Sequence, residues 1–288
     1  MDSWVVACVL FGALLHASWN ALVKSSGDQQ ADLALVHACG ALVAVPLLAF
    51  TGFPPAAAWP FLLSSLAIHM AYYITLNGAY QHGELSLTYP IMRGSAPLLV
   101  ALASGLVLGE SLQPMAWAGI LAVTAGVLMV GLARGADPWH HRRALGYALA
   151  NAAVIACYTL VDGHGVRQAA AAGSTALAYV VMLFVLDGLP YPAWVWWRRT
   201  PAERQGLARY ARQRWPLATL GGLASLGSYG IALWAMTRAP VAVVSALRET
   251  SVLFATLLSV LVLKERFTLR RAAGAGVIVG GVVALRLS

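Results

Sequence analysis

The sequence predicts an all-α integral membrane protein with ten transmembrane helices, arranged as two inverted five-helix repeats. Composition is the first reason: of 288 residues, 60% are hydrophobic and only 10% are charged, whereas a soluble domain carries about 25% charged residues. The other two reasons are the length of the apolar runs and a similarity between the two halves of the chain. A soluble enzyme, a disordered protein and a disulfide scaffold are excluded, because none of them needs so much apolar surface.

Ten apolar runs follow one another along the chain, each close to the ~20 residues with which a helix crosses a bilayer. They cover residues 3–23, 32–51, 58–81, 85–108, 114–133, 144–166, 174–197, 215–237, 240–263 and 271–287. Turn-forming residues separate them, for example at 27–28, 52–55, 82–84, 137–138 and 239–240. Barrel strands are excluded, because they are about half as long and alternate in polarity. The first run has no basic flank and no small-residue cleavage site, so we interpret it as a membrane helix.

One polar segment, residues 198–214, is longer than the other connections. It contains Thr200, Pro201 and Glu203, the residues of a helix N-cap, a first helical turn and a capping box. Leu207 and Tyr210 follow on one side among four arginines. This pattern predicts a short helix that lies on the membrane surface, and a plain basic loop is the alternative.

The two halves of the chain match when the sequence is shifted by 155 residues. Twelve of 36 positions are then identical over residues 93–128. Apolar bias explains some of these matches, but not the pairing of Arg93 with Arg248 or of Glu110 with Glu265. We therefore predict two repeats, residues 1–136 and 137–288. Because each has five helices, the second enters the membrane from the opposite side, and substrate binds near the midplane between them.

Some short motifs in the sequence also match those of a known family. Trp19-Asn20 lies near the end of the first run, and Gly109-Glu110 is matched by Lys264-Glu265-Arg266-Phe267 in the second repeat. In these features and in its 5+5 arrangement, the chain resembles the EamA-repeat transporters of the drug/metabolite transporter superfamily. It is most similar to the bacterial amino-acid exporters, including the aromatic amino-acid branch. The resemblance implies export or exchange of amino acids across the inner membrane.

The predicted function is therefore that of a monomeric secondary transporter, which exports amino acids of broad specificity, including aromatic or apolar ones, by alternating access. A carrier of another metabolite or drug, such as a nucleotide-sugar or a lipid-linked cargo, is the alternative; a membrane enzyme or scaffold is less favoured. The sequence has no HExxH, GxSxG or nucleotide-binding motif, so we expect no enzyme activity, cofactor or metal. The net charge of +8 indicates basic loops at a bilayer and no nucleic-acid partner.

Polar side chains inside the runs mark the candidate substrate site, because lipid does not tolerate them. The third run carries them at helical spacing on one face: His69, Tyr72, Tyr73, Asn77 and Tyr80. The first run contributes His16, Trp19 and Asn20; the sixth contributes Tyr158, near Asn151 and Asp162; and the eighth contributes Tyr229. Aromatic rings with polar tips suit a zwitterion that has an apolar side chain. The alternative is polar contacts that only hold helices together.

Two arginines lie close to the predicted midplane, Arg93 in the fourth run and Arg248 in the ninth. A guanidinium there can grip the substrate carboxylate through two parallel hydrogen bonds. The alternative is that Arg248 pairs with a carboxylate such as Asp162 and joins helices. Glu249, which follows Arg248, attracts the substrate ammonium, carries a coupling proton or is structural. Gly94 and Pro97 predict a kink in the fourth helix.

The distribution of basic residues predicts the orientation. The segments after the first, third, fifth, seventh and ninth runs hold 14 Lys and Arg, and the other face holds three, Arg167, Arg238 and Arg286. Because basic loops stay in the cytoplasm, we predict that both termini lie in the periplasm. Members of the family that the chain resembles are usually drawn with both termini in the cytoplasm.

Overall fold

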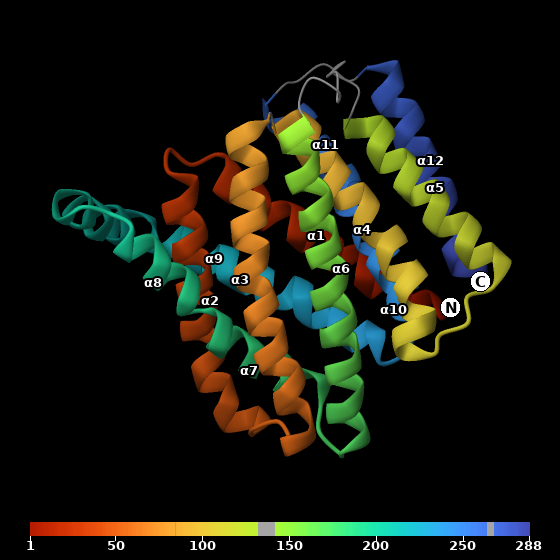
Figure 1. The fold of residues 1–288 in the computed structure, drawn as a ribbon, viewed down its shortest axis with the longest axis horizontal. Helices are drawn as coiled ribbons and strands as arrows, with labels where there is room; N and C mark the ends of the chain where they lie inside the picture. Colours follow the sequence, from red (N-terminus) through yellow and green to blue (C-terminus); the bar gives the residue numbers. More distant parts are fainter. Residues whose placement is uncertain (84, 132–141, 264–267) are drawn as a thin grey trace.

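The computed structural model describes residues 1–83, 85–131, 142–263 and 268–288. Every regular element in this part of the chain is a helix (Figure 1). The predicted boundary between the repeats, the breakers at 84 and 137–138, the basic Arg134 and the motif at 264–267 lie outside the described residues. The all-helical prediction is confirmed.

The helices follow the predicted runs closely. The first repeat contains α1 (Ser3–Lys24), α2 (Gln29–Thr51), the 3-10 turn η1 (Ala56–Ala58), α3 (Trp59–His82), α4 (Leu85–Leu108) and α5 (Pro114–Gly131). The second contains α6 (Arg142–Ala171), α7 (Ala176–Asp187), α8 (Pro190–Trp197), α9 (Pro201–Met236), α10 (Val241–Arg248), α11 (Ser251–Leu263) and α12 (Leu269–Leu287). By length and composition, nine stretches of the described chain can cross a membrane. The tenth helix, α12, has 19 residues and packs along α5.

Side-chain caps define where several helices begin. Asp2 accepts a hydrogen bond from the backbone N–H of Trp4 at the start of α1, and Asp28 accepts one from Ala31 at the start of α2. Such caps satisfy N–H groups that have no partner within the helix. They also place the carboxylates of these two residues at helix ends and outside the apolar spans.

Two spans are divided where the sequence predicted one helix each. The seventh run becomes α7 and α8, separated at Gly188 and Leu189, and Pro190 begins α8 because its ring fits the first turn of a helix. The ninth run becomes α10 and α11, separated at Glu249 and Thr250. The seventh and ninth spans thus consist of discontinuous helices, the kind that forms substrate and ion sites in transporters.

The segment 198–214 is helical as predicted, but the prediction of a short helix was wrong. The capping box of Thr200 and Glu203 is present, but the helix that it starts continues through Pro216 to the end of α9. Its first turns project sideways from the bundle beside α8 (Figure 1). Helix-favouring Ala, Arg, Gln and Glu fill this part, so nothing stops the helix before it reaches the bundle. The Arg214 guanidinium lies 2.5 Å from the Asp32 carboxylate and ties α9 to α2.

The last helices of the two repeats, α5 and α12, pack side by side through four glycines (Figure 1). Gly119 contacts Gly281, and Gly126 contacts Gly274: a Cβ on any of the four would lie 2.8 to 3.0 Å from the carbonyl oxygen of its partner. Gly119 and Gly274 are matched positions of the repeats, as are Gly126 and Gly281. The contact is therefore reciprocal between antiparallel helices, as an inverted repeat requires.

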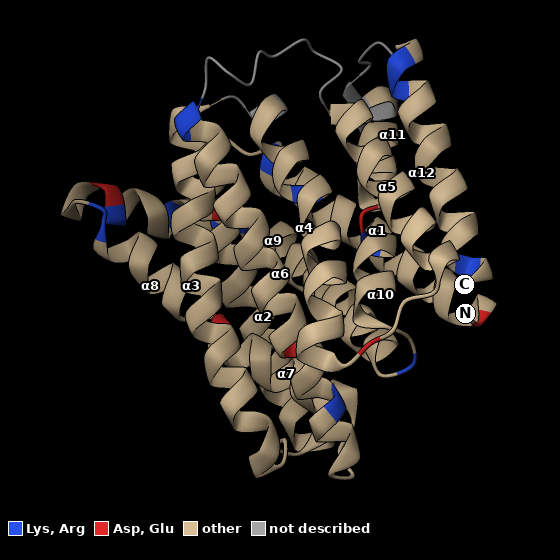
Figure 2. Cartoon of the chain, turned by 45° about the vertical axis from the view of Figure 1, so that its right-hand side comes forward, with Lys and Arg blue, Asp and Glu red and all other residues tan. Residues whose placement is uncertain are grey.

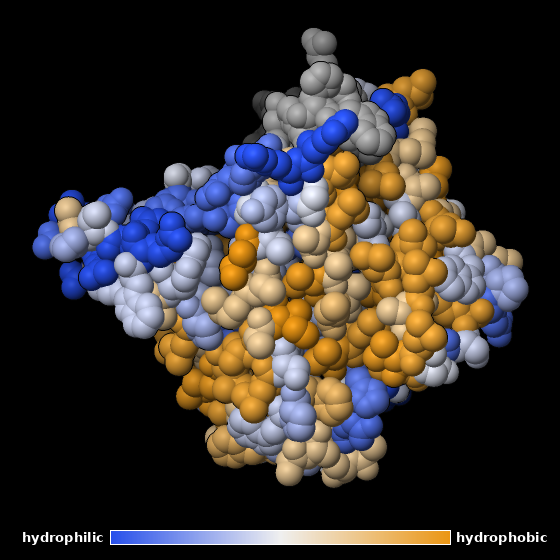
Figure 3. Space-filling view, viewed as in Figure 1, coloured by the Kyte–Doolittle hydropathy of each residue, from blue (hydrophilic) through white to orange (hydrophobic). Residues whose placement is uncertain are grey.

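Charge and apolar surface divide the molecule into layers. Lys and Arg gather at the end of the bundle where α6 and α12 begin, and few charges lie along the middle of the helices (Figure 2). The visible surface below the hydrophilic projection is largely hydrophobic (Figure 3). Large hydrophobic side chains are exposed in the described chain, among them Phe50, at 87%, and Leu106, at 92%. This surface suits the acyl chains of a bilayer.

Candidate functional site

A buried carboxylate, Asp162 of α6, organises one side of the centre of the bundle. Its two oxygens accept hydrogen bonds from the hydroxyl groups of Tyr179 in α7, at 2.9 Å, and Tyr229 in α9, at 2.5 Å. Gly165, one turn further along α6, makes room for this arrangement, because a Cβ there would lie 2.5 Å from the Tyr179 hydroxyl. Three helices of the second repeat are thus joined at one polar point.

The two repeats meet at a buried ion pair. Nε of Arg93 in α4 lies 2.9 Å from Oε2 of Glu249, the residue at which α10 ends. The side chains are only 10% and 4% exposed, although neither of these two atoms has a well-aligned hydrogen bond in the described part of the chain. Buried charges persist only when they are paired. This pair therefore holds the break of the ninth span against the fourth helix.

Arg248, the repeat counterpart of Arg93, has different surroundings. Its guanidinium lies over the ring of Tyr229, 5.1 Å from the ring centre. Among the described residues no carboxylate pairs with it, so the alternative of an Arg248–Asp162 ion pair was wrong. Tyr229 accounts for this, because its ring faces Arg248 and its hydroxyl is bound to Asp162. Arg248 is half-buried and keeps donors for another acceptor.

Aromatic side chains from three helices cluster beside these charged groups. The rings of His69 and Tyr158 stack at 4.6 Å, and Tyr72 and Tyr229 meet Tyr158 edge-on at 6.2 and 6.4 Å. The structure thus brings together predicted residues of α3, α6 and α9. We call these four rings, His69, Tyr72, Tyr158 and Tyr229, the ring wall.

The first helix contributes a second group of rings to the centre. His16 and Trp19 of α1 meet edge-to-face, with their centroids 5.3 Å apart. His16 lies within electrostatic range of both Arg93 and Arg248. The Trp19 indole Nε1 is buried and has no hydrogen-bond partner within the described chain, which leaves a donor available. By contrast, the Asn20 amide donates to the carbonyl oxygen of His16 in its own helix.

The predicted stripe of α3 divides between three places. Tyr80 is 39% exposed and lies near Tyr72, Tyr89 and Arg93. Tyr73 turns to a separate cluster with His37 and Asp187. Asn77 lines a polar pocket. Tyr89, which the sequence analysis missed, lies one turn before Arg93; that spacing was the available signal.

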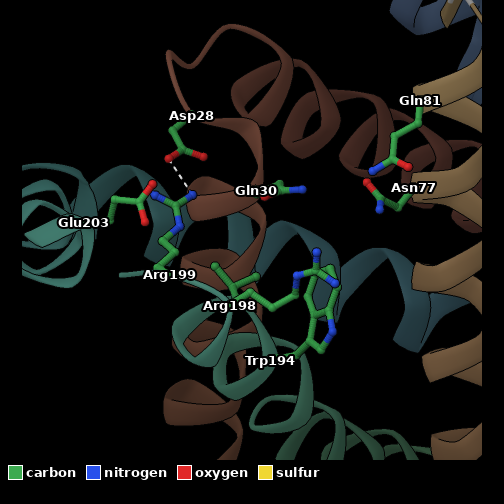
Figure 4. Close-up of a pocket in the computed structure, with 9 residues that line it drawn as sticks. Asp28, Gln30, Asn77, Gln81, Trp194, Arg198, Arg199 and Glu203 are labelled. Carbon is green, nitrogen blue, oxygen red and sulfur yellow. Dashed lines mark hydrogen bonds and ion pairs between the residues drawn. The ribbon is translucent and has the colours of Figure 1, made fainter. Parts of the chain in front are cut away.

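The polar pocket has a volume of about 400 Å³ and lies at the basic end of the bundle (Figure 4). It is lined by Asp28, Gln30, Asn77, Gln81, Trp194, Val195, Arg198, Arg199 and Glu203. The Arg199 guanidinium is 2.6 Å from the Asp28 carboxylate, and Arg198 lies over the Trp194 ring. Asn77 and Gln81 extend toward the pocket from α3 (Figure 4). One helix therefore borders both the pocket and the central rings.

The opposite end of the bundle is tied together by Glu110 and Arg167. Their side chains approach to 2.6 Å. Glu110 also accepts from the backbone N–H of Val241, the first residue of α10, while Arg167 donates to the carbonyl oxygens of Met236 and Ala239. One ion pair thus caps the end of α9 and the start of α10. It links the segment after α4, in the first repeat, to the second repeat.

Comparison with known proteins identifies the family. The family model described as EamA-like transporter family matches the sequence twice, over residues 3–132 and 142–287. The chain belongs to the EamA-like transporter family. One similar crystal structure aligns with 100% of this chain and 99% of its own length, at 17% identity and a TM-score of 0.78. It shows a likeness of fold and nothing more. No curated protein matches the sequence.

EamA membership makes this chain a multi-pass membrane transporter, and the two matches correspond to its two repeats. In the part of the chain that the structure describes, no group of three His, Cys, Asp or Glu side chains could hold a metal ion. The side chains that remain at the centre are those that could hold a small organic molecule, namely Arg248, Trp19 and the ring wall. The chemistry of these side chains is what we use to infer the substrate class.

Proposed function

We propose that this EamA-family chain exports amino acids of broad specificity, including aromatic and apolar ones, across the bacterial inner membrane. It works as a monomer by alternating access, with both termini in the periplasm. The observation that carries the substrate class is Arg248: a cation near the midplane, stacked on a tyrosine and without a carboxylate partner in the described chain. A substrate carboxylate supplies that partner through two parallel hydrogen bonds.

The charge balance of the centre favours a zwitterion. The centre holds two basic groups, Arg93 and Arg248, and two acidic groups, Glu249 and Asp162, so their charges sum to zero when all four are ionised. A nucleotide-sugar brings at least two negative charges, which this centre does not neutralise. An amino acid brings one charge of each sign, and the faces of the tyrosine rings attract its ammonium group.

The ring wall supports the preference for aromatic and apolar side chains. Tyr72, Tyr158 and Tyr229 offer ring faces and edges from three helices, and such surfaces bind apolar groups by stacking and by removing them from water. Trp19 of α1 adds a buried indole N–H that has no partner in the described chain. Because no shape-specific pocket is required for stacking, this site tolerates several side chains.

The arrangement of the two ends supports alternating access. At the basic end a polar pocket is open, and at the other end the Glu110–Arg167 pair joins the repeats. In the predicted orientation the open end faces the cytoplasm, from which an exporter loads. Export then requires the Glu110–Arg167 contact to break and the basic end to close.

Counterflow of labelled amino acids in proteoliposomes tests the proposal. We expect uptake of several aromatic and apolar amino acids, and uptake of none would refute the substrate class. Arg248→Ala should weaken amino-acid binding about tenfold to a hundredfold, the range of a lost charge-assisted hydrogen bond, and should affect decarboxylated amines less. Arg238→Ala is the matched control, because Arg238 also lies 5.1 Å from an aromatic ring centre, that of Trp234. Equal losses for acids and amines would assign Arg248 a structural role.

Thiol labelling tests the orientation. In a background without Cys8, Cys39 and Cys157, Gln205→Cys should be protected from an impermeant reagent in intact spheroplasts, and Ser288→Cys should react. The reverse pattern would invert the orientation and leave the fold unchanged.

A further inference from the structure

A second polar cluster lies beside the central rings and joins three helices. It consists of His37 of α2, Tyr73 of α3 and Asp187, the last residue of α7. The Tyr73 hydroxyl oxygen is 2.7 Å from His37 Nε2 and 3.2 Å from Asp187 Oδ2. The side chains of His37 and Asp187 are only 19% and 14% exposed. The second oxygen of Asp187 is buried and has no partner in the described chain.

The hydrogen bonds of this cluster lack one proton. His37 Nδ1 lies 2.8 Å from the carbonyl oxygen of Leu33, which only accepts, so Nδ1 carries a hydrogen. In the neutral ring Nε2 then has none. The two contacts of the Tyr73 hydroxyl need two hydrogens, but neutral His37, Tyr73 and ionised Asp187 supply only the hydroxyl hydrogen. A proton on Nε2 or on Oδ2 completes both bonds and cancels the buried negative charge.

The cluster spans the interface at which alternating access must act. His37 and Tyr73 belong to the first repeat and Asp187 to the second, so the added proton closes a hydrogen-bonded bridge between the halves. The break after α7 lies here, where a Cβ on Gly188 would approach the carbonyl oxygen of His37 to 3.1 Å. A change in protonation therefore acts on a close contact between α2 and α7.

The cluster also lies between the polar pocket and the central rings. The Tyr73 ring stacks on Tyr191 of α8 at 4.3 Å, and Tyr191 stacks on Trp194, which lines the pocket. On its other side Tyr73 meets Tyr72 edge-on at 5.5 Å. Through these ring contacts the cluster lies next to both the pocket lining and the central rings.

The other titratable groups near Asp187 contact other partners. Along α7, Tyr179 lies two turns away and is bound to Asp162 of α6. Tyr229 of α9 lies beside Phe184, nearly one turn from Asp187. Beyond Tyr191, Asp28 and Arg199 pair with each other. His37 and Tyr73 are therefore the titratable groups in direct contact with the Asp187 carboxylate among the described residues.

We propose that His37, Tyr73 and Asp187 bind one proton and exchange it for substrate, which makes the chain a proton antiporter. This rests on the proposed transport function and adds the coupling ion. The proton binds from the side toward which substrate leaves. It is carried while the halves are bridged, and it is released at the other side before the next substrate loads. One proton and one zwitterion exchange per cycle.

Two transport assays on the same reconstituted protein test the coupling. Wild-type proteoliposomes should exchange labelled amino acid and also accumulate it against its gradient, by about tenfold per unit of imposed pH difference for one-to-one exchange. Asp187→Asn and His37→Gln should keep exchange and lose the accumulation. Tyr191→Phe is the matched control, because it keeps the stacked ring and should keep both activities. Full pH-driven accumulation by a folded Asp187→Asn would overturn the proposal and leave the transport function standing.

A measurement without substrate separates this proposal from the substrate class. In ¹⁵N-histidine spectra, the signal that His37→Gln removes should depend on pH in the wild type, and this pH dependence should shift in Asp187→Asn, because protonated His37 loses its counter-charge. An unchanged pH dependence would overturn the proton site. If no amino acid shows counterflow but this shift is seen, the substrate class fails and the proton site stands.

Discussion

The fourth and ninth spans occupy matched positions in the two repeats, yet they differ in continuity. Helix α4 contains Pro90 and Pro97 and still runs without interruption from Leu85 to Leu108. The ninth span has no proline after its N-cap Pro240, and it divides at Glu249 and Thr250. Proline alone therefore does not decide where a helix of this bundle is interrupted.

The break has a local cause in side-chain chemistry. The backbone N–H groups of Glu249 and Thr250 bond three residues back, to Ala246 and Leu247, in place of the usual four. The Thr250 hydroxyl shares the Leu247 carbonyl oxygen at 2.7 Å, and this competition disturbs helices. Glu249 is held by Arg93 at the same point. The comparison teaches that a buried charge and a hydroxyl can open a helix that two prolines, in its counterpart, do not.

The largest expected effect comes from removing the charge that holds the break. Arg93→Ala should lower the free energy of unfolding by about 3–5 kcal/mol, because it leaves Glu249 buried without a partner. Thermal unfolding in detergent measures this. Arg93→Ala combined with Glu249→Gln should recover much of the loss. If the double variant is as unstable as the single one, the pair is not what stabilises the break.

A smaller effect is expected where α10 begins. Glu110→Ala should cost about 1–3 kcal/mol, because the Val241 N–H and the Arg167 guanidinium both lose an acceptor. Hydrogen exchange at the first amides of α10 should become faster, while exchange in α4 stays unchanged. Glu203→Ala, which removes an exposed cap of α9, is the control and should not alter α10. If the first amides of α10 exchange as slowly in Glu110→Ala as in the wild type, Glu110 does not hold the start of α10.

The hydroxyl at the break should contribute less. Thr250→Val removes one hydrogen bond, worth about 1 kcal/mol, and takes away the competitor for the Leu247 carbonyl. We expect slower hydrogen exchange of the amides at 250–253 as the ninth span approaches a continuous helix. Thr219→Val removes the same kind of bond within the unbroken α9 and should not slow exchange nearby. Faster exchange in Thr250→Val would show that the hydroxyl supports the turn.

The smallest effect on stability should come from the second arginine of the matched pair. Arg248→Lys keeps the charge over the Tyr229 ring, so the free energy of unfolding should change by less than about 1 kcal/mol. Amino-acid affinity should fall, because an ammonium cannot form the two-pronged contact of a guanidinium. Counterflow and thermal unfolding of the same preparation measure both. A large loss of stability without a change in affinity would reverse the roles of Arg93 and Arg248.

The sequence predicted the helices well because membrane spans are set by long apolar runs, which composition reveals directly. It also predicted the repeat, because Arg93 and Arg248 stand out in an apolar background. The breaks at Gly188 and Glu249 were not predicted, since they depend on contacts with α2 and α4. The continuity of α9 with its basic segment was missed for a different reason. The arginines of 198–214 indicated a separate segment at the membrane surface, although helix-favouring residues continue without a break from this segment into the apolar span.

The sequence showed which polar residues lie inside the spans, but it did not show which of them contact one another. His69, Tyr72, Tyr158 and Tyr229 do come together, because helical spacing places each on an inward face. Tyr73 follows Tyr72 directly and points about 100° away from it around the helix, into the cluster with His37 and Asp187. Those two residues were passed over, because each stands apart from the other polar residues of its run, on α2 and α7, and forms no stripe at helical spacing.

The glycine contact between α5 and α12 has a consequence for the origin of the chain. Because Gly119 meets the counterpart of Gly126, and Gly126 meets the counterpart of Gly119, the surface is complementary to an inverted copy of itself. A single repeat already carries both sides of the contact. Two separate and identical half-length proteins, inserted in opposite directions, could thus have associated through it before any gene fusion. For this contact, duplication of the gene then needed no new interface.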